Sequence, residues 1–172
     1  MMHITKNITE SLLGTLCHMS DRTKDGTKAR YDLKWLRIRK DLQAPDSDDD
    51  DDDDDQTEGT QGRRKRVKKN AVMLTPACFS MSKEELDQFF RCLLGVKVPH
   101  GYSEKISRYL YASKKKFTGM KSRDCHVLMT QILPVAIRGL MDEHVRDTLT
   151  ALCNFIDVVS RKSISVKQVD KL

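Results

Sequence analysis

The chain has 172 residues, with 38% apolar, 33% charged and only 6% aromatic side chains, and a formal net charge of +6 at pH 7. Few aromatic residues argue against a β-sandwich, five widely spaced cysteines without a CxxC pair argue against a disulfide framework, and the chain lacks a membrane span of ~18 consecutive apolar residues. The composition favours a soluble, intracellular, all-α protein without a signal peptide.

The first predicted element is a helical hairpin within residues 1–44. Apolar residues recur at helical spacing from Thr5 to His18 and again roughly from Thr27 to Lys40, with a polar turn between the two stretches. The predicted apolar stripe of the first helix comprises Ile8, Leu12, Leu13, Leu16 and Met19, and that of the second comprises Ala29, Leu33, Leu36 and Lys40 with Trp35 beside it. Each helix is too short to be stable without packing.

Residues 45–70 are predicted to form a disordered linker that is first rich in Asp and then in Arg and Lys. Eight consecutive aspartates, Asp48 to Asp55, repel one another and offer nothing to bury. We interpret this run as a solvated spacer. The alternative interpretation is a tail that mimics a histone or gathers metal ions.

A basic heptad follows the aspartates and is typical of a nuclear localisation signal displayed on flexible chain. Its six bases are Arg63, Arg64, Lys65, Arg66, Lys68 and Lys69. The motif predicts binding to a nuclear import receptor and localisation to the nucleus. The alternative is an arm that balances the aspartates or touches phosphates nonspecifically.

Residues 71–118 are predicted to be a helical connecting segment. Ser82 is a favoured N-cap and Glu85 completes a capping box, while Gly95 ends the helix. The predicted buried face comprises Leu86, Phe89, Phe90, Leu93 and Leu94. A shorter amphipathic helix with Ile106, Tyr109 and Leu110 should follow, and then a basic loop.

The basic loop contributes candidate contacts to DNA. Outside the acidic run and the basic heptad the chain remains strongly basic, which suits a polyanionic partner. The candidate DNA-contact residues beside Phe117 are Lys114, Lys115, Lys116, Lys121 and Arg123. They predict weak, sequence-independent binding to phosphates, and a merely solvated basic loop is the alternative.

Residues 119–172 are predicted to begin a small helical bundle. Ser122 or Asp124 should cap a helix that is apolar around most of its girth and kinked at Pro134. Asp142 should cap the next helix. Its predicted apolar seam comprises Val145, Leu149, Leu152, Ile156 and Val159. We expect the first turn of the central helix to pack against this next helix.

Cys125 and His126 stand side by side at the start of the central helix and could be mistaken for a reactive pair. Adjacent helical residues point about a quarter-turn apart, which is poor geometry for proton transfer between them. The histidines and cysteines also lack the paired short spacing of a zinc site. We therefore expect both side chains to be structural, with no catalytic residue, metal, cofactor or small-molecule substrate.

The stretch "KSRDCHVLMTQILPVAIRG" closely resembles the opening of a domain of unknown function found beside the transposase region of plant CACTA (En/Spm-type) transposons. Its signature residues are Asp124, Cys125, His126, Val127, Leu128 and Met129. Arg123 replaces a histidine of the usual form. The stretches "MHITKNITESLLGTL" and "TKDGTKARYDLKWLRIRKDL" resemble the end of the transposase domain, and residues 75–110 resemble the segment that joins the two.

The resemblance implies that residues 1–44 are the C-terminal remnant of a transposase domain. It also implies that residues 119–172 are the N-terminal part of the domain of unknown function. Transposases of this family are thought to cut and rejoin DNA with metal ions held by acidic side chains. The expected acid-bearing segments fall before Met2 and beyond Leu172. We therefore expect a non-catalytic module that contacts DNA nonspecifically or binds transposase subunits. An active metal-dependent transposase and a domesticated nuclear protein-interaction module are the alternatives.

Overall fold

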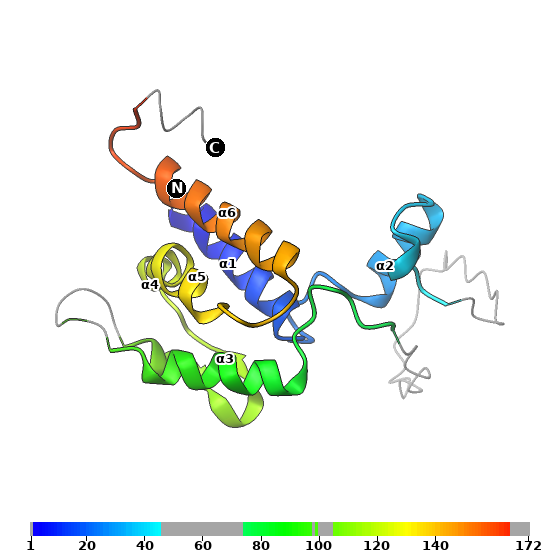
Figure 1. Cartoon of the computed structure of the whole chain (residues 1–172), viewed down its shortest axis with the longest axis horizontal. Coiled ribbons are helices and arrows are strands. Elements are labelled where there is room, and N and C mark those ends of the chain that lie inside the picture. The colour runs from blue at the N-terminus through cyan, green and yellow to red at the C-terminus, as the bar shows by residue number, and fades with distance from the viewer. Residues whose placement is uncertain (1, 46–73, 98, 100–104, 166–172) are drawn as a thin grey trace, which may run out of the picture. The chain divides into compact units, whose positions relative to one another are not determined.

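The computed structural model describes residues 2–45, 74–97, 99 and 105–165 (Figure 1). The chain divides into two compact units, one made of residues 1–25 and 77–172 and the other of residues 26–76. The predicted aspartate run and basic heptad lie outside the described residues. In the described part of the chain, every helix is too short or too polar to cross a membrane.

The first unit is a bundle of helices, and the predicted helical fold is confirmed (Figure 1). Its helices are α1 (Met2–Leu16), α3 (Lys83–Gly95), α4 (Ser122–Val127), the π-helical segment η4 (Leu128–Ile132), α5 (Leu133–Ala136) and α6 (Glu143–Val159). A short 3₁₀ helix, η2 (Ile106–Tyr109), and a two-stranded sheet follow α3 in the sequence. A single cluster of buried apolar side chains joins these elements.

The continuous column α4–η4–α5 lies at the centre of the bundle, as its apolar girth predicts. Leu128, Met129 and Leu133 are fully buried. At Pro134, which cannot donate a backbone hydrogen bond, the helix changes register instead of simply kinking: the Leu133 N–H donates to the Leu128 carbonyl, five residues back. The column ends at Ala136, earlier than its apolar pattern suggests.

The first turn of the central column packs against α1, which corrects the expected contact with the helix after Asp142. α6 packs instead against η4 and α5, one to two turns further along (Figure 1). The buried face of α1 also differs from the predicted stripe, because Ile8 and Leu12 are only partly buried while Thr5 and Thr9 are buried. The Thr9 hydroxyl donates to the Thr5 carbonyl at 2.7 Å, so its burial leaves no unsatisfied donor.

Helix α3 begins at the predicted capping box. Ser82 Oγ accepts from the Glu85 backbone N–H at 3.2 Å, and the Glu85 carboxylate accepts from the Ser82 N–H at 2.8 Å. Leu86, Phe89, Phe90 and Leu93 are buried as predicted. Leu94 is wrongly placed on the buried face by the sequence pattern, because its side chain is exposed.

Glu85 also fastens α3 to the loop before α6. Its second carboxylate oxygen accepts from the Met141 backbone N–H at 2.6 Å. Met141 has φ +58°, a left-handed conformation that a side chain rarely adopts without support. Backbone N–H donation from Ser82 and Met141 lowers the pKa of the Glu85 carboxyl. One carboxylate thus caps a helix and holds a strained turn 56 residues away.

We expect Glu85→Ala to lower the free energy of unfolding by about 1–3 kcal/mol at neutral pH, because a cap and a charge-assisted hydrogen bond are lost together. Because folding lowers the pKa of the Glu85 carboxyl, the stability that its carboxylate contributes is fully present above the ordinary glutamate pKa of about 4.3. That contribution is lost as pH falls through the lowered pKa of the folded state. Urea titrations at neutral and acidic pH should therefore show the variant and parent converging in acid. Glu84→Ala, a change at the exposed neighbour, is the matched control and should have little effect.

The second unit contains α2 (Thr27–Trp35) and the 3₁₀ helix η1 (Lys40–Leu42). The two helices predicted to form a hairpin both exist, but α1 belongs to the first unit and α2 to the second. Helix α2 ends at Trp35 and not near Lys40, and Arg37 and Arg39 have φ of +57° and +46°. Its predicted apolar line is also wrong, because Arg30 is its buried residue while Trp35 and Leu36 are exposed.

Candidate nucleic-acid interface

The predicted basic loop is a small β-hairpin. Strand β1 (Leu110–Tyr111) pairs antiparallel with β2 (Lys116–Phe117), in the register Leu110 with Phe117 and Tyr111 with Lys116. The 3₁₀ turn η3 (Ala112–Lys114) and Lys115, with φ +47°, close the hairpin. The amphipathic helix predicted before it is the 3₁₀ helix η2.

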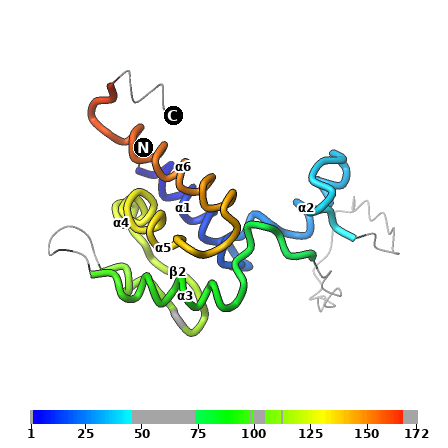
Figure 2. Tube along the Cα trace, in the orientation of Figure 1, coloured from blue at the N-terminus to red at the C-terminus, as the bar shows by residue number. Residues whose placement is uncertain are grey.

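The two faces of the hairpin have different roles. Leu110 and Phe117 are buried, and the Phe117 ring lies 5.3 Å from the Phe90 ring and 6.5 Å from the Phe89 ring, centroid to centroid. Strand β2 accordingly runs beside α3 (Figure 2). Phe117 is therefore a core residue that cannot stack on a nucleic-acid base. Tyr111, on the opposite face, is 56% exposed and is the aromatic side chain that accompanies the hairpin bases.

Two of the five candidate bases are held by acids. Lys115 Nζ lies 2.7 Å from an Asp87 carboxylate oxygen on α3, and Lys116 Nζ lies 3.4 Å from Asp21. The hydrogen bond from Lys115 lowers the pKa of Asp87. A backbone hydrogen bond, with a smaller contribution from Lys116, lowers the pKa of Asp21. Solvent screens surface pairs of this kind, so they contribute little to stability and a phosphate group can compete for both lysines.

The remaining candidates are exposed. Lys114 lies in the hairpin turn, Lys121 immediately precedes α4, and Arg123 lies in its first turn. The end of η2, immediately before the hairpin, is tied to the start of α4, since the Tyr109 hydroxyl donates to the buried Asp124 carboxylate at 2.8 Å. Lys121 stands at the N-cap position of α4, which corrects the expectation of Ser122 or Asp124 there.

The motif residues after Arg123 serve packing. Cys125, Val127, Leu128 and Met129 are buried, and burial is the main reason that the pKa of the Cys125 thiol rises to about 11. A thiolate is therefore scarce at neutral pH, which supports a structural role for Cys125. His126 is half-buried. Within the described residues, no three His, Cys, Asp or Glu side chains come together as metal ligands.

The lining of one surface depression includes none of the candidate bases. A shallow depression of about 460 Å³ lies along α1 and the loop after it, lined mostly by apolar atoms. Its lining residues are Asn7, Ile8, Ser11, Leu12, Thr15 and Lys24. The basic surface, by contrast, projects from a hairpin and a helix start, which suits an extended polyanion better than a small molecule.

Sequence reasoning found the bases but missed their surroundings. Asp21 and Lys116 are 95 residues apart, so no local pattern predicts their pairing. Tyr111 could have been found only from the alternation of buried and exposed residues in two strands of two residues each, which is too short to detect.

No family model, curated protein or solved structure matches this chain. Its function is therefore argued from its residues.

Proposed function

We propose that this chain is a non-catalytic, helical nucleic-acid-binding module derived from a CACTA-type transposase. The proposed partners are DNA without sequence preference and other transposase subunits. The observation that supports DNA binding is the projecting hairpin, which presents Lys114 and the partly exposed Lys115 and Lys116 beside Tyr111. Lys121 and Arg123 are close to them in sequence.

The mechanism is phosphate neutralisation. The bases displace condensed counterions from the duplex, so affinity falls as salt rises, by a slope of about 0.9 per phosphate contact in the logarithmic plot. Lys115 and Lys116 would exchange Asp87 and Asp21 for phosphates. Four of the five side chains are lysines, whose ammonium groups act as point charges on phosphates, so the sequence of the DNA should matter little.

We expect the combined variant Lys114→Ala, Lys121→Ala, Arg123→Ala to bind labelled duplex more weakly whatever its sequence, with a salt slope smaller by up to about 2–3. Fluorescence anisotropy at several salt concentrations measures both quantities. The matched control removes three exposed bases elsewhere, Arg138, Arg161 and Lys162, and should keep most of the affinity.

Equal loss of binding in the two triple variants would mean that total charge, and not the hairpin surface, is responsible. Binding that ignores salt would contradict phosphate neutralisation. Adding Mg²⁺ or Mn²⁺ to the same mixture tests the non-catalytic part of the proposal. Metal-dependent cleavage that a substitution in this chain abolishes would favour an active transposase instead.

We also propose that the chain is imported into the nucleus through Arg63 to Lys69, which lie outside the described residues. Replacing Arg64, Lys65 and Arg66 with alanine in a fluorescent fusion too large for passive entry should leave it in the cytoplasm. Replacing Asp49, Asp50 and Asp51 instead is the control and should leave the fusion nuclear. An unchanged nuclear signal in the basic-residue variant would remove the proposal.

A further inference from the structure

The second unit carries an aromatic and basic surface that the proposed function does not use. Trp35, the one tryptophan of the sequence, is 82% exposed at the last residue of α2. Leu36 and Ile38 beside it are about half exposed. Indole rings bury a large area when they can, so a ring left this open on a folded support is suited to contact a ligand.

The backbone around Trp35 is held in place. The Leu36 N–H donates to the Asp32 carbonyl at 2.9 Å, and the Ile38 N–H donates to the Leu33 carbonyl at 3.1 Å. The Gln43 side-chain amide donates to the Ile38 carbonyl at 3.0 Å. These bonds fix the turn after α2, so the indole stands on a structured element.

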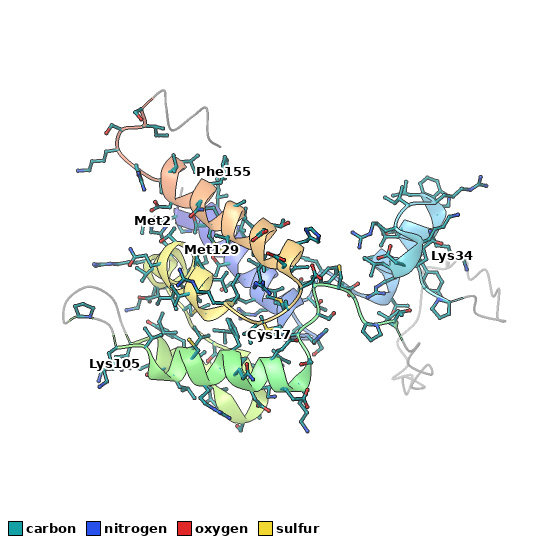
Figure 3. All side chains as sticks on the ribbon, viewed as in Figure 1. Met2, Cys17, Lys34, Lys105, Met129 and Phe155 are labelled. Carbon is teal, nitrogen blue, oxygen red and sulfur yellow. The ribbon has the colours of Figure 1, made fainter. Side chains whose placement is uncertain are left out.

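The residues that flank Trp35 in the sequence are rich in bases. From Thr27 to Leu42 there are six bases and two acids. The Arg39 guanidinium donates two hydrogen bonds to the carboxylate of one of these acids, Asp41, at 2.9 and 3.2 Å. Arg37 and Lys40, close to Trp35 in sequence, are exposed. Lys34, the residue before Trp35, is labelled in Figure 3. The ligand that suits this surface is an anion.

We propose that the Trp35 surface binds single-stranded nucleic acid, with a base stacked on the indole and the backbone phosphates near Arg37 and Lys40. A base supplies the flat, partly apolar face that the ring can cover, and the phosphates supply the negative charge. A duplex keeps its bases stacked inside and offers the ring little. A purely apolar partner would have to desolvate the surrounding cations.

This surface is independent of the hairpin. It lies in the other compact unit and shares no residue with the proposed duplex contacts. Failure of one proposal therefore leaves the other standing, and the two can be measured separately.

The test uses the intrinsic fluorescence of the full chain, because Trp35 is its only tryptophan. Excitation beyond the tyrosine absorption reports this surface alone. We expect saturable quenching on titration with a thymidine oligonucleotide of about 10 residues, which is within the usual length for a single-strand site. Quenching should weaken as salt increases. The same duplex used for the hairpin should quench Trp35 fluorescence much less than the oligonucleotide does. Heparin, a polyanion that has no bases to stack on the indole, should also quench much less.

Variants then separate stacking from charge, with affinity measured by the anisotropy of a labelled oligonucleotide. Trp35→Ala should weaken binding about tenfold, and Trp35→Phe should retain most of the affinity, since phenyl rings also stack. Arg37→Gln should mainly reduce the salt slope. Phe155→Ala removes another exposed aromatic ring, on α6, and is the control that should bind like the parent. Circular dichroism of Trp35→Ala checks that this exposed change leaves the helices intact.

Three results would overturn the proposal. The first is no quenching by the oligonucleotide, or equal quenching by oligonucleotide and heparin. The second is a blue shift of Trp35 emission that depends on protein concentration without ligand, which would assign the apolar face to a second copy of the chain. The third is a blue shift with anionic phosphatidylserine vesicles that exceeds any response to the oligonucleotide, which would assign it to a lipid surface.

Discussion

Leu128→Ala should lower the free energy of unfolding of the first unit by about 2–5 kcal/mol, because the substitution removes a fully buried side chain and leaves a cavity. Leu128 begins the π-helical segment η4, which contacts α4, α5 and α6.

The measurement is a urea titration followed by far-ultraviolet circular dichroism, since Trp35 belongs to the other unit and does not report on this core. Val135→Ala, in the adjoining helix α5, is the matched control, because Val135 is 53% exposed and should cost well under 1 kcal/mol. Similar midpoints for the two variants would mean that Leu128 is not central to the core.

Gly14→Ala should also destabilise the first unit, by about 1–3 kcal/mol, although the same change within a helix usually stabilises it by ~0.5–1 kcal/mol. A Cβ atom at Gly14 would lie 2.6 Å from the Cβ of Arg22 and 2.7 Å from its backbone carbonyl carbon and oxygen. The loop after α1 folds back onto this glycine, with the Met19 N–H donating to the Gly14 carbonyl at 2.8 Å. A methyl group must therefore displace backbone, not a flexible side chain.

Gly95→Ala is the control for Gly14→Ala. Gly95 is the last residue of α3, and an added Cβ there meets no atom within 4 Å. We expect Gly95→Ala to be neutral or slightly stabilising by helix propensity alone. Thermal unfolding of the two variants beside the parent measures the difference. Gly14→Ala with a melting temperature at or above that of Gly95→Ala would contradict the close approach of Arg22.

Much of the helical fold could be predicted from sequence, because helix signals are local. Ser82 and Glu85 form the expected capping box, and Asp142 accepts from the His144 N–H at 2.9 Å as expected of an N-cap. The predicted apolar seam of α6 is confirmed at Leu149 and Ile156. Cys153 is also buried on this helix, although the predicted seam does not contain it. These features depend on residues three or four positions apart, within the reach of a periodic pattern.

Choosing which face of a short helix is buried needed the tertiary structure. On α1 the apolar pattern favours Ile8 and Leu12, but contact with α4 buries Thr5 and Thr9 more deeply. Threonine can be buried there because its hydroxyl can bond to the carbonyl one turn earlier. Hydrophobicity alone ranks these residues wrongly, since the packing partner decides which side is covered.

The candidate interface shows the same division. Composition and caps are properties of neighbouring residues, so the sequence alone predicts that bases gather between Lys114 and Arg123, that helices flank them, and where α3 and α6 begin. Tertiary packing instead places Phe117 in the core and Tyr111 outside it, and brings Lys116 to Asp21. It also decided that Glu85 holds Met141. These contacts join residues far apart in the chain, and their geometry exists only once the helices have packed.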